Sequence, residues 1–476
     1  MLIISNKFQN VITEVIKKII FDFSRHPVVK DYFELVQSLD RGFLTAARET
    51  MIRFFESVDE DFAGSARRKE FYYTKGRFSR TIMTVFGEIR FDRNYYVPKH
   101  APRCRGFFFV DRELGLPHRD YYDPLVKAMV IEKSALFSFG QTGTIVGEMI
   151  GPRFALLAQN ALRHISRQTV RNIVRNADVS PLSPPSIKQA VETLYVQLDE
   201  KFVHTQRSQG RDCEIKAAVV YEDVAEVYKG RHCLVNRHLL ASVTDSADLV
   251  SQILNYLYAT YDLDRLKYLI VSGDGAGWIK AAAADLSISA TVKRVLVLDP
   301  FHTGQAIQRI SHSPAVQTRI RDDLFRIRGD HFRVFCLTLI AADPDRVEMI
   351  TQNMNYLLNN WSAIRNQRDP RFKGCSMEAH ISHDLAALFT ARPKAHSLSM
   401  IQKRLRLRTL SVNGCDIKAL YLANHTAFVP LEDPYSFDAQ HYPLSPLDST
   451  TRRLSPLYRL IKEAGELRPA SLHALY

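Results

Sequence analysis

Two aspartates stand where apolar runs of the sequence end. Asp199 ends the run 194–199, and Asp274 follows the run 268–271 inside the segment SGDGAGW at 272–278. Glycine on both sides of Asp274 allows a sharp backbone turn and the close approach of a ligand. In open α/β sheets, ligands bind at the carboxyl ends of parallel strands. If the two runs are neighbouring strands, the two carboxylates face each other at one end of the sheet.

Two carboxylates held close together repel each other, and a cation between them removes that cost. Mg²⁺ prefers oxygen ligands, keeps several waters and takes one or two carboxylates plus substrate phosphate oxygens. Two such ions roughly 4 Å apart can activate a water or a 3′-hydroxyl and stabilise the leaving oxygen of a phosphodiester. Glu378 is the best third carboxylate, because it opens a predicted helix and shares a face with Ile381, Ser382 and Leu385. We expect that helix to aim Glu378 at the sheet.

Each of these residues also has a purely structural interpretation. An aspartate at a strand end often forms a turn, and a glutamate at a helix start favours the helix macrodipole. Asp299 ends a further apolar run and stands three residues before His302. The pair either lies near the metal site or forms a structural turn fixed by Pro300, and the sequence leaves both interpretations open.

Other chemistries find weaker support. His380 and His383 are one helical turn apart and would bind zinc only with a distant partner, because none of the six cysteines forms a C-x-x-C pair. The segment 272–278 is not a G-x-G-x-x-G fingerprint and lacks the lysine and Ser/Thr of a phosphate-binding loop. No serine or cysteine nucleophile motif is present.

The elements that must position the aspartates read as an α/β core. The predicted strands are 194–199, 215–221, 234–243, 268–271 and 295–298. A helix with apolar positions from 249 to 257, capped near Asp245 or Ser246, follows the third strand. The order β-β-β-α-β-α-β is that of the RNase H-like fold, a mixed five-stranded sheet with flanking helices. Residues 303–370 break this rhythm and read as an all-helical insertion before a helix at 377–389.

The N-terminal part is expected to be mainly helical and to bind DNA. Residues 10–60 have helix-period apolar positions, and residues 80–93 read as a hairpin around Gly87. A helix capped at Ser166 resembles the recognition helix of a helix-turn-helix, although an ordinary amphipathic surface helix has the same pattern. Its polar residues are Arg167, Gln168, Arg171 and Arg175. A proline- and serine-rich run at 180–186 indicates a linker.

These patterns divide the chain into successive regions. The expected regions are an N-terminal helical region with a hairpin (1–100), a helix-turn-helix-like domain (101–180), a linker (181–190), the first part of the core (191–302), the helical insertion (303–370), the second part of the core (371–410) and a C-terminal appendage (411–476).

The bulk composition agrees with a nucleic-acid partner. The chain of 476 residues has a net charge of +13, and a pI near 9.4. Such a charge favours a polyanion, with nucleic acid as the first choice and an anionic membrane surface as the second. No apolar stretch of ~18 residues is present, and the first ten residues lack the apolar run of a signal peptide. The cytoplasm is therefore the expected compartment.

Several blocks together resemble a known family. The segments YVQLDE (195–200), SGDGAGW (272–278), LDPFH (298–302), GCSMEAHISH (374–383) and TVFGEIRFDR (84–93) are similar to the successive blocks of the ISLre-type insertion-sequence transposases. The resemblance covers about residues 70 to 410, and its specificity lies in the combination and order of the blocks.

The resemblance implies a bacterial DDE transposase related to the Mutator-like group. Asp199, Asp274 and Glu378 would then be its first, second and third catalytic acids and hold Mg²⁺ or Mn²⁺. Asp299 and His302 resemble a [C/D]-x-x-H signature just before the insertion. Trp361 would either stack on a flipped base or belong to the core of the insertion.

The implied partners are the double-stranded terminal inverted repeats of the element and its target DNA, bound in the bacterial nucleoid. Joining two ends requires a dimer or a larger homo-oligomer. Two alternatives remain, a non-catalytic DNA-binding regulator that uses the helices at 121–176 and an RNase H-superfamily nuclease that cuts without joining.

Overall fold

A computed structural model describes most of the chain between residues 32 and 426. The described residues are 13, 17, 32–99, 106–116, 120–151, 164–180, 187–206, 213–326, 329–390 and 396–426. The linker residues 181–186, nearly all of the helical positions before residue 32 and the tail beyond residue 426 lie outside them. The chain divides into two compact units. One comprises Met1–Val130, Phe139–Ile173 and Tyr421–Tyr476, and the other comprises Ile131–Ser138 and Val174–Leu420.

The first unit contains a long helix and a small antiparallel sheet. Its elements are α2 (Tyr32–Gly64), α3 (Ala66–Phe71), β1 (Tyr72–Thr84), β2 (Gly87–Pro98), β3 (Phe107–Phe108) and α4 (Phe109–Glu113). The hairpin predicted around Gly87 is confirmed, since β1 and β2 pair from Tyr72↔Pro98 to Thr84↔Gly87. Gly87 has φ of 109°, and the Thr84 hydroxyl donates to its carbonyl at 2.8 Å. This φ value explains why glycine stands at the turn.

Three helices follow the hairpin where the sequence predicts helical structure. They are α5 (Pro124–Ser134), α6 (Phe139–Met149) and α7 (Arg167–Asn176). The Ser166 hydroxyl accepts a hydrogen bond from the Thr169 amide at 3.1 Å, so the predicted N-cap of α7 is confirmed. α6 passes close to the start of α7, because a Cβ at Gly143 would lie 2.0 Å from the Ile165 carbonyl oxygen.

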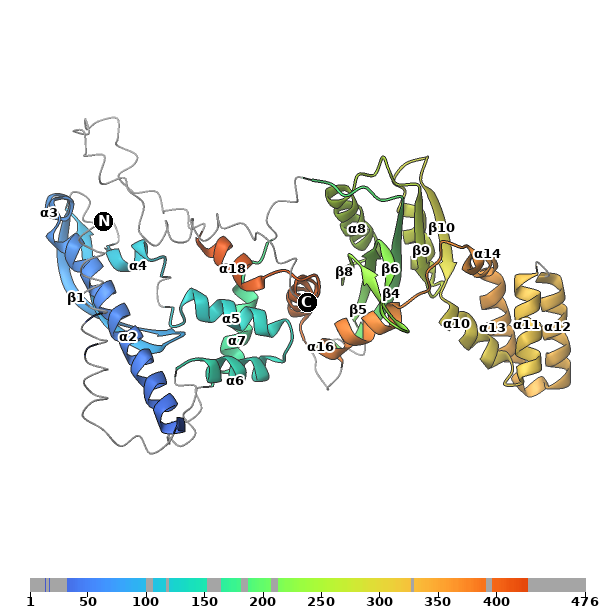
Figure 1. Cartoon of the computed structure of the whole chain (residues 1–476), viewed down its shortest axis with the longest axis horizontal. Coiled ribbons are helices and arrows are strands. Elements are labelled where there is room, and N and C mark those ends of the chain that lie inside the picture. Colours follow the sequence, from blue (N-terminus) through green and yellow to red (C-terminus); the bar gives the residue numbers. More distant parts are fainter. Residues whose placement is uncertain are drawn as a thin grey trace. The chain divides into compact units, whose positions relative to one another are not determined.

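A mixed five-stranded sheet organises the second unit (Figure 1). Its strands are β4 (Thr193–Val203), β5 (Cys213–Tyr221), β8 (His238–Ser242), β9 (Tyr268–Gly273) and β10 (Lys293–Leu298). They lie in the order β10-β9-β4-β5-β8. β9 is parallel to both β10 and β4, whereas β5 is antiparallel to β4 and β8. The prediction of a mixed five-stranded α/β sheet with flanking helices is therefore confirmed.

The prediction of one continuous strand at 234–243 is wrong. Residues 231–235 form β7, which pairs with β6 (Asp223–Tyr228) in a separate hairpin, and only 238–242 join the sheet as β8. The break falls at Asn236, whose φ of 49° is left-handed. A strand cannot continue through that conformation, which asparagine tolerates better than most residues.

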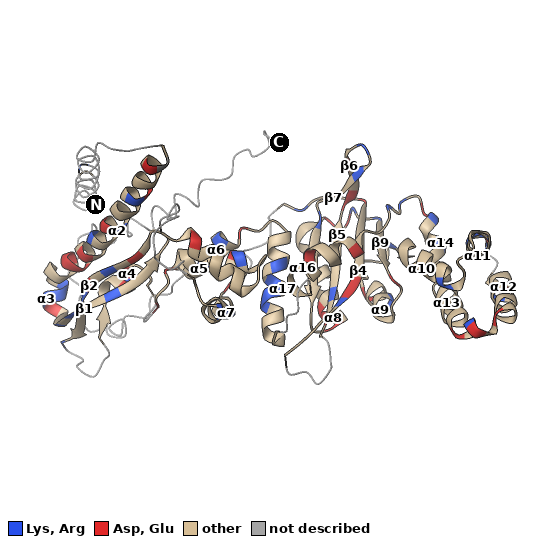
Figure 2. Ribbon diagram, turned by 90° about the horizontal axis from the view of Figure 1, so that it is seen from below, with Lys and Arg blue, Asp and Glu red and all other residues tan. Residues whose placement is uncertain are grey.

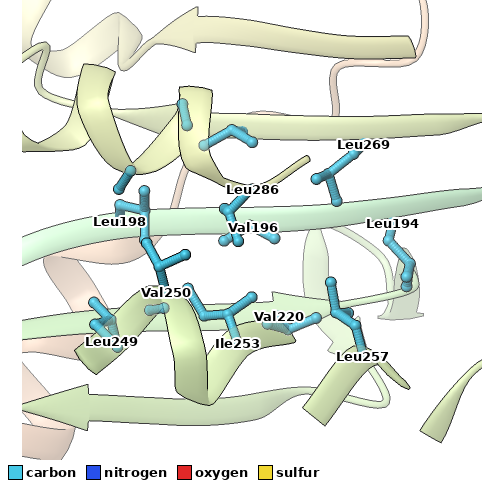
Figure 3. Packing of buried hydrophobic residues seen from close by; sticks show 14 of the residues in the cluster. Leu194, Val196, Leu198, Val220, Leu249, Val250, Ile253, Leu257, Leu269 and Leu286 are labelled. Carbon is cyan, nitrogen blue, oxygen red and sulfur yellow. The ribbon is translucent and has the colours of Figure 1, made fainter. Parts of the chain in front are cut away.

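Each face of the sheet has its own hydrophobic core. Leu194, Val196 and Leu198 of β4 pack under α8 (Ser246–Thr260) and α9 (Gly277–Asp285), as Figure 3 shows for part of this cluster. The predicted helix cap is Asp245, which accepts from the Asp248 amide. The odd-numbered residues of β4 point to the other face, because side chains alternate along a strand.

A helix with an irregular middle covers that other face. It consists of α15 (Met377–His380), a π-helical turn (Ile381–Ala386) and α16 (Ala387–Phe389), and α17 (Leu398–Val412) packs beside it. The helix predicted at 377–389 is therefore present, with a π turn in it. Met377, Ile381 and Leu385 are buried on its inner side.

Helices with a core of their own connect β10 to α15. They are α10 (Pro300–Ile310), α11 (Pro314–Phe325), α12 (Gly329–Ala342), α13 (Val347–Asn359) and α14 (Trp361–Arg365), with short 3-10 turns at Pro344–Arg346 and Asn366–Arg368. The predicted all-helical insertion is confirmed over its described residues, and its first helix begins earlier than predicted, at Pro300. The last described helix of the chain is α18 (Ile417–Thr426). Within the described ranges, no helix has the length and apolar composition needed to cross a membrane.

Candidate metal-binding active site

Parallel pairing brings Asp199 and Asp274 to the same level of the sheet. The register of β4 and β9 ends with Gln197 opposite Ser272. Each aspartate lies two residues beyond one member of this pair, so both belong to the sheet face covered by α15. The two runs are neighbouring parallel strands, as the expected site requires. The expectation that Asp199 ends its strand is wrong, because β4 continues to Val203.

The glycines around Asp274 are required by close contacts. A Cβ at Gly273 would lie 2.8 Å from the Leu198 carbonyl oxygen, and one at Gly275 would lie 2.6 Å from Asn360 Oδ1. Gly275 also has φ of 84°. The resulting turn is held by the Asp274 carboxylate, which accepts from the Ala276 amide at 2.8 Å, and by the Tyr356 hydroxyl, which donates to the Asp274 carbonyl at 2.5 Å. Tyr356 belongs to α13, so the helical insertion fixes the backbone of Asp274.

The carboxyl group of Asp199 is in an environment that opposes its negative charge. Burial raises its pKa to about 7, and the nearby carboxylates of Glu378 and Asp274 act in the same direction. The backbone N–H of Glu200 and the ring of His302 act in the opposite direction. A carboxyl group in such an environment gains much from a bound cation, since the cation offsets both the burial and the repulsion.

Glu378 lies at the start of α15, next to His302. Its Oε1 is 3.4 Å from His302 Nε2, and its side chain is 54% exposed. Ile381 and Leu385 are buried as expected, but Ser382 faces the solvent, so the expected shared face is wrong at that position. Ser382 lies within the π turn that begins at Ile381. Glu378 therefore stands at the rim of the site and not beneath the helix.

Asp299 and His302 have different roles in the structure. Asp299 caps α10, since its carboxylate accepts from the Phe301 amide at 2.9 Å, and its own amide donates to the Gly273 carbonyl at 2.8 Å. This is the structural turn that the sequence left open. His302 instead reaches the carboxylate of Glu378 from the first turn of the same helix.

Gln197 is a residue of the site that the sequence reasoning missed. It is buried on β4, and its Oε1 accepts from the Ser376 amide at 3.1 Å and from the Ser376 hydroxyl at 3.2 Å. Its Nε2 donates to the Tyr221 hydroxyl at 3.0 Å. Gln197 thus ties the strand of Asp199 to the start of the helix of Glu378. A polar residue within the apolar run 194–198 was the available signal.

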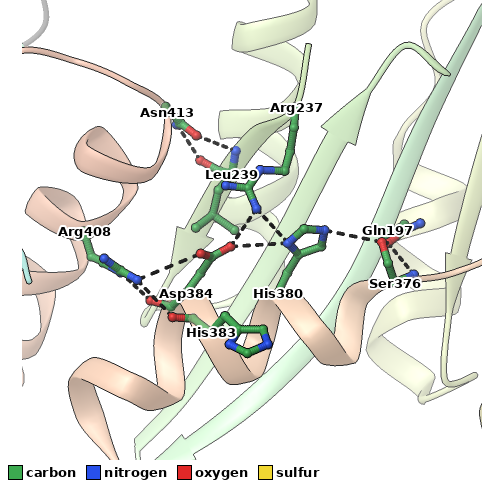
Figure 4. Close-up of polar contacts among 9 residues, drawn as sticks. All are labelled: Gln197, Arg237, Leu239, Ser376, His380, His383, Asp384, Arg408 and Asn413. Atoms are coloured by element: carbon green, nitrogen blue, oxygen red, sulfur yellow. Dashed lines mark hydrogen bonds and ion pairs between the residues drawn. The ribbon is translucent and has the colours of Figure 1, made fainter. Parts of the chain in front are cut away.

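The two histidines of the possible zinc pair do not act together. His380 lies between Ser376 and Asp384, whereas the His383 ring is exposed and its backbone carbonyl accepts from Arg408 at 2.9 Å (Figure 4). In the part of the chain that the structure describes, no three His, Cys, Asp or Glu side chains already form a ready ligand cage.

The predicted DNA-contacting residues lie on α7. Arg167, Gln168 and Arg175 are exposed and Arg171 is half-buried, while Val170 and Val174 are buried. Gln168 donates to Asn172 one turn further on, at 3.1 Å. The helix is therefore amphipathic as predicted, which agrees with both of its interpretations. Trp361 lies partly buried in the insertion, with its ring 6.5 Å from that of Phe332.

The basic stretch at 403–408 is used inside the protein. Figure 2 shows its Lys and Arg residues along α17. Lys403 donates to the Ala177 carbonyl at 2.7 Å, and the fully buried Arg404 donates to the Phe137 carbonyl at 2.8 Å. Arg408 donates to the Asp384 carbonyl at 2.6 Å. These charges are therefore committed to backbone oxygens of the chain.

Comparisons with known proteins identify a family but not an activity. A family model described as "Uncharacterised protein family (UPF0236)" matches residues 30–425. Similar proteins include several UPF0236 proteins of Caldanaerobacter subterraneus subsp. tengcongensis. One is 28% identical over 81% of this chain and 77% of its own length, and the name of that protein joins four gene designations. Another is 27% identical over 81% of this chain and 79% of its own length, and its name joins eleven.

One solved structure shares a weak similarity with the chain. It is the cryoEM structure of a simian T-cell lymphotropic virus intasome in complex with PP2A regulatory subunit B56 gamma. The similarity has a TM-score of 0.14 and 9% identity, and covers 42% of this chain and 65% of that one. At this level it supports no statement about the fold.

The resemblance to the ISLre-type transposases is corrected by these findings. The family that matches the chain from residue 30 to 425 is UPF0236, an uncharacterised family, and its curated relatives bear the same description. The blocks that suggested the resemblance are short, and their order alone did not identify the family.

Proposed function

The chain belongs to the uncharacterised protein family UPF0236, and we propose that it is a DNA transposase with an RNase H-like core. In this proposal it binds the ends of a bacterial mobile element and catalyses metal-dependent cleavage and strand transfer. One observation carries the proposal: β4 and β9 pair in parallel and place Asp199 and Asp274 on the same face, and burial together with the charges of Glu378 and Asp274 raises the pKa of Asp199 to about 7.

The carboxylates fit a divalent metal by charge and by ligand type. Asp199 and Asp274 come from neighbouring parallel strands, and Glu378 approaches from the helix above them. Mg²⁺ or Mn²⁺ held by these three residues would activate a water or a 3′-hydroxyl and stabilise the leaving oxygen of a phosphodiester. His302, at 3.4 Å from Glu378, orients that carboxylate from the side of the insertion.

The RNase H-like assignment is supported by the arrangement of the elements. In a mixed five-stranded sheet, Asp199 lies within the central strand β4 and Asp274 directly follows the neighbouring parallel strand β9, and the third carboxylate lies on a helix that packs on the sheet after a helical insertion.

Two observations favour DNA as the substrate: the positive net charge of the chain and the several gene designations in the names of its relatives. The net charge of +13 favours a polyanion, and α7 presents basic residues on an exposed face. Relatives whose names join four and eleven gene designations are expected if the gene multiplies within a genome. A mobile element that encodes its own transposase would behave in this way.

The test is cleavage of labelled DNA that carries the ends of the encoding element, with Mg²⁺ or Mn²⁺ and with EDTA. We expect metal-dependent cutting at the ends that is lost in Glu378→Gln. The matched control is Glu348→Gln, the same change at an exposed position of α13, which should cut like wild type. Cutting that survives in Glu378→Gln would remove Glu378 from the site.

The same assay separates the two alternatives. Tight binding to the ends without any cutting by wild type would favour a non-catalytic DNA-binding regulator. Cutting without joining of the 3′-ends to target DNA would favour a nuclease. Joined products that disappear with EDTA would support the transposase.

A further inference from the structure

A connected set of polar side chains lies behind Glu378. Figure 4 shows His380 at its centre. Its Nε2 is 3.3 Å from the Ser376 hydroxyl, and its Nδ1 is 2.8 Å from Arg237 and 3.3 Å from Asp384. Because the Arg237 guanidinium is always a donor, Nδ1 accepts from it and Nε2 carries the ring proton. His380 therefore donates to Ser376.

The far side of the His380 ring is held by charged groups. Arg237 donates to Asp384 at 3.0 Å, and Arg408 lies 3.9 Å from the other carboxylate oxygen of Asp384. With Nδ1 accepting from Arg237, its approach to Asp384 is a contact and not a hydrogen bond, so the two arginines hold the Asp384 carboxylate. Asp384 is thus a fixed anion between two arginines, and it holds the position of Arg237 against the ring.

On its Nε2 side, His380 is connected through Ser376 to the segments that carry Glu378 and Asp199. Ser376 receives the hydrogen bond of His380 and donates its own to Gln197 Oε1 at 3.2 Å. Ser376 lies two residues before Glu378, and Gln197 lies two residues before Asp199. The chain of hydrogen bonds from Arg237 through His380 and Ser376 to Gln197 therefore sets the start of α15 against β4.

We propose that His380 is a positioning residue that, through Ser376 and Gln197, fixes Glu378 relative to Asp199 for metal binding. This inference rests on the proposed function and deepens it, because it says which residues keep the third carboxylate in place. Glu378 needs such support, since its own side chain is half exposed and starts a helix of only one regular turn. Partners behind metal ligands commonly control ligand orientation and metal affinity.

The π turn gives this interpretation a structural basis. It begins at Ile381, directly after His380, and contains Asp384. π turns interrupt the regular hydrogen-bond ladder and occur frequently at functional sites. Here the π turn contains Asp384, which contacts His380. The polar contacts of His380 therefore stabilise the helix where its regular hydrogen bonds are interrupted.

The test measures Mn²⁺ affinity of the DNA-free full-length chain by electron paramagnetic resonance titration. We expect His380→Ala to weaken Mn²⁺ binding about tenfold, in the range typical of residues behind metal ligands. His380→Gln keeps an N–H that can reach Ser376 and should restore most of the affinity. His383→Ala, on the same helix with an exposed ring, is the control and should bind as wild type does.

A second variant covers the case in which His380→Ala does not fold. Ser376→Ala removes one hydroxyl from the chain and should weaken Mn²⁺ binding to a similar extent, with no further loss in the double variant, because both interrupt the same path. Circular dichroism and binding to end DNA should be unchanged in all variants. A loss confined to metal affinity separates positioning from general destabilisation.

The outcomes are distinguishable from failure of the proposed function. If wild type binds Mn²⁺ and both His380→Ala and Ser376→Ala bind it equally well, the positioning role is wrong and the metal site stands. If Gln at position 380 is no better than Ala, the hydrogen bond to Ser376 is not what matters, and the inference also fails. If wild type itself binds no Mn²⁺, the proposed function and the inference fall together.

Discussion

The folded structure disfavours the charged form of the Asp199 carboxyl group. Its pKa is raised from an ordinary aspartate value to about 7, first by burial and then by Glu378 and Asp274. The folded chain therefore binds a proton there between about pH 4 and pH 7 that the unfolded chain has lost. This contribution to stability is complete below about pH 4 and is lost as the pH rises towards 7, so without metal the charged carboxylate destabilises the fold.

Asp199→Asn should make the metal-free protein more stable at pH 8 and should change little at pH 4. The neutral amide avoids the burial and repulsion of the carboxylate, which is a difference of roughly 2–4 kcal/mol for a shift of this size. The measurement is thermal unfolding in EDTA at both pH values. Added Mn²⁺ should raise the melting temperature of wild type but not of the variant, and a variant less stable than wild type at pH 8 would contradict the argument.

At the scale of elements, the turn after β9 depends on its glycines to different degrees. Gly275 has φ of 84° and faces Asn360, whereas a Cβ at Gly277, where α9 starts, would have no neighbouring atom within 4 Å. Gly275→Ala should cost about 1–3 kcal/mol through strain and contact. Gly277→Ala should be neutral or slightly stabilising, because alanine favours helix.

Urea unfolding of the two glycine variants provides the comparison. The same substitution two residues apart then separates the effect of the tight turn from that of adding a methyl group. Equal stability of the two variants would mean that the turn tolerates a side chain. It would also remove the structural reason for glycine beside Asp274.

The α7 helix makes a prediction about salt dependence. If the polar residues of α7 contact phosphates, changing Arg167, Gln168 and Arg171 to alanine should weaken end binding. The slope of log affinity against log salt should fall by up to about 2, one for each arginine. Arg321→Ala removes an exposed arginine from α11 instead of α7, and it should leave end binding and its salt dependence unchanged. An unchanged affinity in the triple variant would favour the ordinary surface-helix interpretation.

At the scale of the whole molecule, the second unit contains its own hydrophobic clusters on both faces of the sheet and in the insertion. We expect the fragment Val174–Leu420 to fold alone and to unfold cooperatively on heating, although Arg404 loses its acceptor at Phe137. Circular dichroism is the measurement. A fragment ending at residue 370 should not fold, because it lacks the helices that cover one face of the sheet. Cooperative unfolding of the shorter fragment would contradict this.

The sequence alone determined most of the local elements, including the two strands that bear or precede Asp199 and Asp274. Apolar runs that end at Asp199 and before Asp274 indicated buried strands, and Asp245 and Ser166 signalled helix starts that the structure has. These features depend on periodicity, capping and glycine conformation, which act over a few residues. Such local features can therefore be predicted without knowledge of the tertiary contacts.

Only the tertiary structure decided the contacts between distant segments. In the structure, the predicted strand at 234–243 is divided into two strands, and Asp299 caps a helix. Glu378 is half exposed and lies beside His302. The tertiary structure also joins Gln197 to Ser376, 179 residues away. Such contacts depend on strand order and on the packing of α15, which no local pattern encodes, because the same short segment can pack against many different partners.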